Sequence, residues 1–148
     1  MLCINSYSQE YIDQCRAKVD AQVSAYQEIV AVSDDLKGAS RKRLDDAVDE
    51  FDPLFYNSMV LMLDTYFVHR SRTLELKDGN PLNEVRVLCN SIVSNNGKYA
   101  SEKSIKLNPA KSLLSYDDGD EIKLTEQDFL LLSKEFFAEL ETKFLESA

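Results

Sequence analysis

The side chains that could take part in chemistry gather around one short stretch, CNSIVSNNG, residues 89–97. Asn90 and Ser94 place an amide and a hydroxyl near the predicted end of a helix, and Arg86 precedes Asn90 by one helical turn. His69, the only histidine, lies in the preceding predicted helix. A site that cleaves a phosphodiester needs a group that polarises the phosphate and a group that accepts a proton. Arg86, Asn90 and His69 are the residues that could supply them.

The same residues also have a structural interpretation. The sequence Asn-Asn-Gly at positions 95–97 is a typical helix stop, because asparagine and glycine readily adopt the left-handed backbone conformation. His69 is predicted to fall on the inward stripe of its helix, where a hydrogen-bonded histidine at the edge of a core is the commoner outcome. We favour this structural interpretation.

Other kinds of site lack their residues. One histidine cannot provide the paired-histidine motifs of zinc or di-iron proteins. The acidic stretch 117–121, DDGDE, does not have the alternating ligand spacing of a calcium loop, and four glycines form no phosphate-binding loop. We therefore expect no metal ion and no cofactor, and interpret DDGDE as a solvated turn.

Composition indicates an ordinary globular protein. The 148 residues are 44% hydrophobic and 29% charged, which predicts one domain over residues 1–148. No apolar run is long enough to cross a bilayer, and the start does not resemble a secretory signal, so we expect no membrane association. Three scattered cysteines suit reduced thiols in a cytoplasmic protein.

The charge is negative overall but unevenly distributed. The net charge of −9 argues against non-specific nucleic-acid binding, and we expect no DNA partner. Residues 69–111 carry eight basic and four acidic side chains, so this stretch is the one where an anion would be attracted. Solvated surface is the default interpretation of such a stretch, and RNA binding is only weakly supported.

Apolar periodicity predicts four long helical stretches. The first begins with Ser6 and Gln9 as a capping box and ends at Gly38. The second begins at Ser40 and runs collinearly to about residue 74, with Pro53 marking either a kink or a restart. Asn80 caps the third helix. The predicted inward stripes are 12, 15, 19, 23, 26 and 30; 44, 48, 51, 55, 59, 62 and 66; and 82, 85, 89 and 92.

The last helix has the strongest pattern. Thr125 and Asp128 form a capping box before it, and its apolar stripe is Phe129, Leu132, Phe136, Leu140 and Phe144. Before it lies an irregular insert, in which residues 104–107 and 121–124 could pair as a short β-ribbon and Asn108-Pro109 could start a helical turn. These elements predict an all-α, up-and-down four-helix bundle.

Residues 82–146 resemble the C-terminal half of HEPN domains, small helical bundles found in many prokaryotic ribonucleases and toxins. Those domains commonly carry a phrase like RNxIVHNNG at the end of the penultimate helix, and then GDxIxLTxxDF at the start of the last. This sequence reads NSIVSNNG from Asn90 and GDEIKLTEQDF from Gly119. The phrase KDGNPLNEVRVLC, residues 77–89, is also similar to one in small uncharacterised actinobacterial proteins, a resemblance that implies no activity.

The sequence departs from the HEPN pattern at the residues that matter for catalysis. Active members carry an arginine and, four to six residues later, a histidine that acts in attack by the RNA 2′-hydroxyl. Cys89 stands at the arginine position and Ser94 at the histidine position, while Asn90 is retained. Serine is not a general base near neutral pH, and cysteine is not a fixed cation. We expect Asn90 to satisfy backbone groups near the helix end.

Two hypotheses follow. The favoured one is a non-catalytic HEPN-like bundle that acts through protein association, as a homodimer. The resemblance implies that the interface includes Asn90 and Ser94, and the resemblance alone implies a role in toxin–antitoxin or phage-defence systems. The alternative is a metal-independent ribonuclease with substituted chemistry that uses Arg86, Asn90 and His69.

Overall fold

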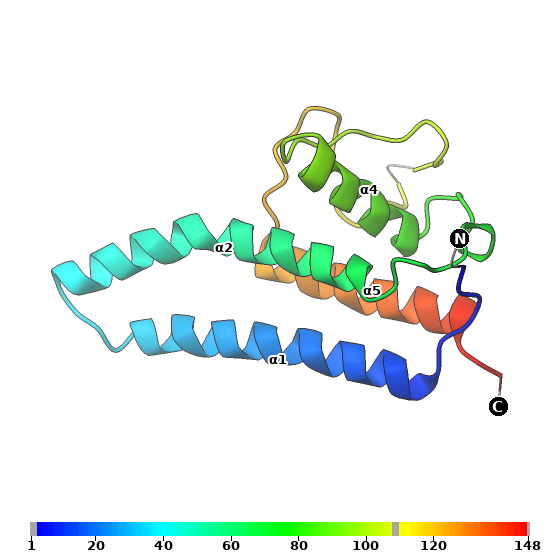
Figure 1. The fold of residues 1–148 in the computed structure, drawn as a ribbon. Coiled ribbons are helices and arrows are strands. Elements are labelled where there is room, and N and C mark those ends of the chain that lie inside the picture. Colours follow the sequence, from blue (N-terminus) through cyan, green and yellow to red (C-terminus); the bar gives the residue numbers. More distant parts are fainter. Residues whose placement is uncertain (1–2, 108–109, 148) are drawn as a thin grey trace.

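The computed structural model describes residues 3–107 and 110–147, and its regular structure is helical (Figure 1). The four long helices run alternately in opposite directions, and α2 packs against each of the other three. The all-α prediction and the up-and-down order are therefore confirmed. The helices are α1 (Gln9–Ser33), α2 (Ala39–Thr65), the single-turn α3 (Arg72–Glu75), α4 (Pro81–Ser94) and α5 (Glu126–Phe144).

Capping residues fix most of the helix starts. Asn80 accepts hydrogen bonds from the backbone N–H groups at the start of α4, and Thr125 with Asp128 forms the predicted capping box of α5. The predicted start of α1 is wrong by two residues, because Ser8 rather than Ser6 accepts the N–H of Tyr11. A serine side chain can cap only from the residue next to the first helical turn.

Gly38 serves a different helix from the one predicted. Its φ of 74° is the left-handed value expected of a glycine at a chain reversal. However, α1 already ends at Ser33, and Gly38 is the N-cap residue of α2. The glycine therefore turns the chain into α2 after a short loop.

Helix α2 continues through Pro53 and ends at Thr65. The predicted extension to residue 74 is wrong, because the chain turns after Thr65 and forms the separate helix α3. The predicted inward stripe is also rotated: of its members from 55 onwards only Met59 is fully buried. Since α2 contacts α4 and α5 as well as α1, its core side is centred between those partners. The buried side chains are Tyr56, Met59, Val60 and Leu63.

The core is centred on α5. Its predicted stripe is confirmed, because all five members are completely buried: Phe129, Leu132, Phe136, Leu140 and Phe144. Phe67, just beyond α2, packs against the ring of Phe136. The N-terminal segment closes this end of the bundle, since Tyr7 exchanges backbone hydrogen bonds with Phe144 and Glu146.

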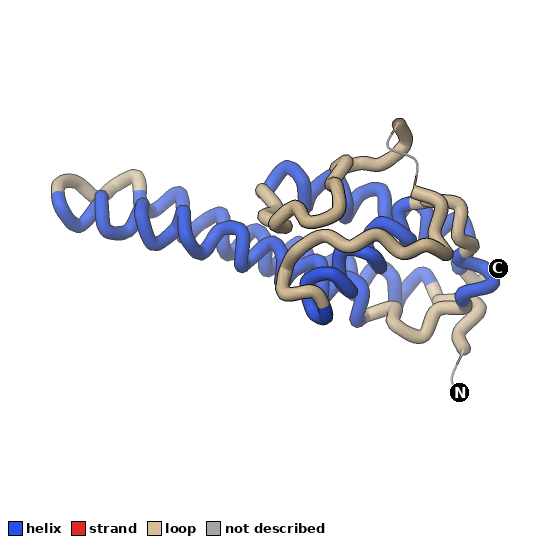
Figure 2. Tube along the Cα trace, turned by 90° about the horizontal axis from the view of Figure 1, so that it is seen from above, coloured by secondary structure: helices blue, strands red, loops and turns tan. Residues whose placement is uncertain are grey.

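The α1–α2 hairpin extends well beyond α4 and α5 as a two-helix arm (Figures 1 and 2). We define the arm as residues 28–54. Phe51 faces α1 as predicted, with its ring against that of Tyr26, but half of it is exposed because two helices alone cannot enclose it. The arm also exposes four further large apolar side chains: Ile29, Val32, Leu36 and Leu54.

The irregular insert between α4 and α5 packs against α4. Its buried side chains include Tyr99, Ile105 and Ile122, and it hides the outer face of α4, so that residues 82–89 are all buried. The predicted β-ribbon is wrong: Lys98 pairs with Glu121 in an isolated antiparallel bridge, while the backbone of residue 106 bonds to residue 77. Asn108-Pro109 lies outside the described residues.

A close backbone contact holds the insert to the loop before α4. Gly79 has a φ of 87°, and a Cβ there would lie 2.5 Å from the Lys106 carbonyl oxygen. Only glycine tolerates both conditions. The insert is thus anchored at the N-terminal end of α4.

Candidate functional site at the end of α4

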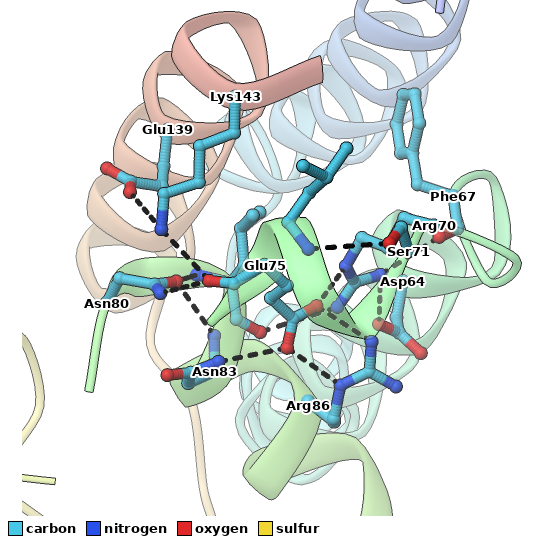
Figure 3. Close-up of polar contacts among 12 residues, drawn as sticks. Asp64, Phe67, Arg70, Ser71, Glu75, Asn80, Asn83, Arg86, Glu139 and Lys143 are labelled. Carbon is cyan, nitrogen blue, oxygen red and sulfur yellow. Dashed lines mark hydrogen bonds and ion pairs between the residues drawn. The ribbon is translucent and has the colours of Figure 1, made fainter. Parts of the chain in front are cut away.

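A buried ionic network underlies the start of α4 (Figure 3). The Glu75 carboxylate accepts hydrogen bonds from Arg70 Nε at 2.5 Å and from Arg86 Nε at 3.0 Å, and a second Arg86 nitrogen lies at 2.7 Å. Asn83 donates to the same carboxylate at 2.9 Å. Arg70 also pairs with Asp64 at 2.9 Å. We call Asp64, Arg70, Glu75, Asn83 and Arg86 the Glu75 network.

The charges inside the Glu75 network are balanced. Burial acts to raise the pKa of Glu75, but the hydrogen bonds and positive charges of Arg86 and Arg70 outweigh it and lower that pKa. Burial acts to lower the pKa of Arg86, but the hydrogen bond to Glu75 outweighs burial and raises that pKa. Two guanidinium groups, those of Arg70 and Arg86, thus face the carboxylates of Glu75 and Asp64.

This arrangement removes Arg86 from the surface. Its side chain is 8% exposed and that of Arg70 is wholly buried. Both arginines belong to the basic stretch at residues 69–111. That stretch therefore offers less accessible positive charge than its sequence indicates. Arg86 cannot reach an external phosphate without giving up its two hydrogen bonds to the buried Glu75 carboxylate, which is energetically costly.

The degenerate motif positions divide between core and surface. Cys89 is buried, directs its thiol toward the Val60 carbonyl oxygen at 3.5 Å, and has a raised pKa because of burial. Asn90 and Ser94 are exposed, and the Asn90 amide donates to Glu102 of the insert. The role predicted for Asn90 is wrong. Ser91 instead bonds to the backbone, donating to Val87 and accepting from Ala100 N–H.

His69 lies away from these residues. The prediction that it occupies an inward helical position is wrong, because α2 ends at Thr65 and His69 is exposed in the turn that follows. It borders a shallow groove beside Tyr7, Tyr66 and the C-terminal segment. The exposed His69 and the buried Arg86 thus do not face a common surface, and the three residues of the ribonuclease hypothesis are not brought together.

A groove of about 520 Å³ runs between α2 and the end of α4. Its apolar lining comes from Pro53, Leu54, Ile92 and Ile122. Val93, next to Ile92 in sequence, is 70% exposed. The polar lining is mainly acidic, with carboxylates from Asp49, Glu50 and Glu121 and one lysine, Lys123. Such a surface repels phosphate and suits a protein partner that carries apolar and basic side chains. We call residues 90–97 the α4 end.

Residues 3–107 and 110–147 contain neither a metal-binding cluster nor a membrane-spanning helix. No three histidine, cysteine, aspartate or glutamate side chains come together there as a metal ion would need. None of the helices described has both the length and the apolar character to cross a bilayer.

Comparison of the chain with family models, with curated proteins and with solved structures found no significant match. The function must therefore be argued from the surfaces and the side chains themselves.

The Glu75 network is not predicted from the sequence, although the sequence contains one signal of it. Arg86 stands between Val85 and Val87 in a helix with apolar residues on nearly every face. A helix that is apolar all round is buried, and a buried arginine needs an anionic partner. The partner itself could not be identified from spacing, because Glu75 comes from a separate one-turn helix.

Proposed function

We propose that this protein is a non-catalytic helical bundle that acts by associating with another protein through the α4 end and the adjoining groove, with a second copy of itself as the partner. The observation that carries this proposal is the state of Arg86. The one arginine placed to serve a phosphodiester at the α4 end is instead bound by Glu75 in the interior. What remains at the surface is Val93, Leu54 and neutral polar groups beside carboxylates.

The exposed apolar residues support association rather than catalysis. Val93 and Leu54 are both more than half exposed, on the two helices that flank one groove. Exposed apolar surface bordered by polar groups is typical of protein interfaces. A HEPN-like origin, in which the catalytic pair was replaced at Cys89 and Ser94, is part of this proposal, as is a role in toxin–antitoxin or phage-defence systems.

The test uses one disruptive substitution and one matched control. Val93→Asp introduces a charge at the α4 end, whereas Val68→Asp introduces it at another exposed valine, in the turn after α2 that borders the groove beside Tyr7 and Glu146. We expect light scattering after size-exclusion chromatography to show a dimer for the parent and for Val68→Asp, and a monomer for Val93→Asp. A dimer that survives Val93→Asp unchanged would contradict the proposed surface.

The ribonuclease alternative has its own test. We expect no cleavage when total RNA is incubated with the parent protein. Arg86→Ala is a poor control, since it would remove one of the two guanidinium groups that neutralise the buried Glu75, and His69→Ala is better because His69 is exposed. Cleavage by the parent that is lost in His69→Ala would overturn the non-catalytic proposal.

A further inference from the structure

The charges on the arm are sorted along α2. All four charged residues between positions 37 and 43 are basic, and all five between positions 45 and 52 are acidic. Part of this charge is already paired within the arm: Arg41 binds Asp34 and Asp45, and Lys42 binds Asp46.

Arg43 and Glu50 are not paired in this way. Both side chains are exposed, and among the described residues neither forms an ion pair. Arg43, Ala47, Glu50 and Leu54 follow one another at spacings of four, three and four, so they lie on one face of α2. Glu50 and Leu54 line the groove beside the α4 end. This face therefore continues the groove outward along the arm.

The geometry points to a second copy of this chain as the occupant of that face, with the two α2 helices packed antiparallel and Arg43 of each copy paired with Glu50 of the other. This inference rests on the proposed function, because it specifies the contacting face and the orientation of the proposed association. When Arg43 of one copy faces Glu50 of the other, the numbers of any two facing residues on the antiparallel α2 helices add up to 93.

The rest of the face fits the same pairing. The symmetry axis passes beside Ala47, whose small side chain allows the two helices to approach closely. Ala39, the first residue of α2, comes opposite Leu54 of the other copy, so the exposed Leu36 in the loop just before α2 lies at the groove end of the partner. The apolar tip of each arm would thus cover the groove of its partner.

Charge complementarity distinguishes a second copy from other occupants. Arg43 and Glu50 are seven residues apart, roughly 10 Å along the helix, and the reciprocal arrangement satisfies both twice. A basic partner would leave Arg43 opposed by like charge, and an acidic partner would do the same to Glu50. The face is self-complementary, as a two-fold symmetric interface requires.

The test exploits this reciprocity. In Arg43→Glu both contacts become acid against acid, and in Glu50→Arg both become base against base, so each variant alone should self-associate at least about tenfold more weakly. In an equimolar mixture of the two variants, the acid introduced at position 43 faces the base introduced at position 50. The native residues at the second contact, Glu50 and Arg43, are also opposite in charge.

We therefore expect the mixture to regain the parent's association, measured by sedimentation velocity at low salt. Arg72→Glu, an exposed arginine on α3 at the other end of the molecule, is the matched control and should behave as the parent does. A dimeric parent whose single variants are unaffected, or whose mixture does not recover, would overturn the pairing while leaving the proposed association intact. A parent that is monomeric at tens of micromolar would overturn both.

Discussion

The four-helix part of the bundle, which we call the base, and the arm use charged residues in opposite ways. In the base, Arg70 and Arg86 are buried and fully engaged by Glu75 and Asp64. On the arm, Arg43 is exposed, and among the described residues it forms no ion pair. Four helices enclose the base, whereas two helices form the arm.

The difference between these regions separates residues that hold the fold together from residues that are available to a partner. A buried charge must be neutralised inside the protein, so its chemistry is fixed by its internal partner. An exposed apolar or charged side chain has no such constraint. Arg86 belongs to the first class. For this reason we propose association rather than catalysis at the α4 end.

The largest effect should come from the apolar part of the base. Phe136→Ala removes a completely buried ring and should cost about 3–5 kcal/mol of unfolding free energy. For a chain of this length, that lowers the melting temperature by roughly 10 °C. Glu135→Ala, its neighbour on a less buried side, should change the unfolding free energy by less than about 0.5 kcal/mol. A neutral Phe136→Ala would show that α5 is not packed as described.

The ionic part of the base should come next. Glu75→Gln removes the negative charge that neutralises Arg70 and Arg86 but keeps the shape of the side chain, and should cost about 3 kcal/mol. Glu28→Gln, an exposed glutamate on the arm, is the matched control and should be neutral. Urea unfolding measures both. If the two substitutions have equal effects, the Glu75 network contributes nothing specific.

A smaller effect concerns Glu84, another acid in the base, which accepts hydrogen bonds from Ser112 and the Leu113 N–H of the insert. Its pKa is raised by burial, against the effect of those hydrogen bonds. The folded state therefore holds this proton at a higher pH than the unfolded state, and stability falls as pH rises through the folded pKa.

Removing that titration should be visible in the pH dependence. The parent should gain stability from Glu84 as the pH falls from 7 toward 5. We expect the Glu84→Gln variant to lack this gain. Glu75 does not interfere in this range, because its pKa is lowered and its contribution is lost only in more acidic solution. Identical pH profiles for the parent and Glu84→Gln would contradict the assignment.

The smallest effect on folding should be seen on the arm. Leu54→Ala should change the unfolding free energy of the monomer by less than about 0.5 kcal/mol, because Leu54 is 59% exposed. Leu63→Ala, the same substitution at a buried position of α2, should cost about 2–5 kcal/mol. Urea unfolding at concentrations low enough to keep the chain monomeric separates the two. A large effect of Leu54→Ala would mean that the arm is packed within its own chain.

Much of the fold could be predicted from local patterns, and the failures have a common cause. The capping box at Thr125 and the stripe of α5 depend on residues close in sequence, and both predictions are confirmed. The orientation of α2 and the pairing of the insert depend on which elements meet in space. Periodicity alone does not contain that information.

The candidate site was harder to predict than the fold. Cys89, Asn90 and Ser94 were singled out correctly as neighbours on one helix, but the separation of His69 from Arg86 follows from the end of α2 at Thr65, which the pattern did not mark. The Glu75 network joins four segments of chain, and apart from Arg86 between its apolar neighbours its members carry no local signature.

The most direct measurement is the mass of the protein in solution, determined by sedimentation equilibrium from sub-micromolar to tens of micromolar concentration. A protein that acts by self-association through the α4 end and the arm should rise with concentration to twice its chain mass of 16.9 kDa. A mass that stays at 16.9 kDa throughout would contradict it.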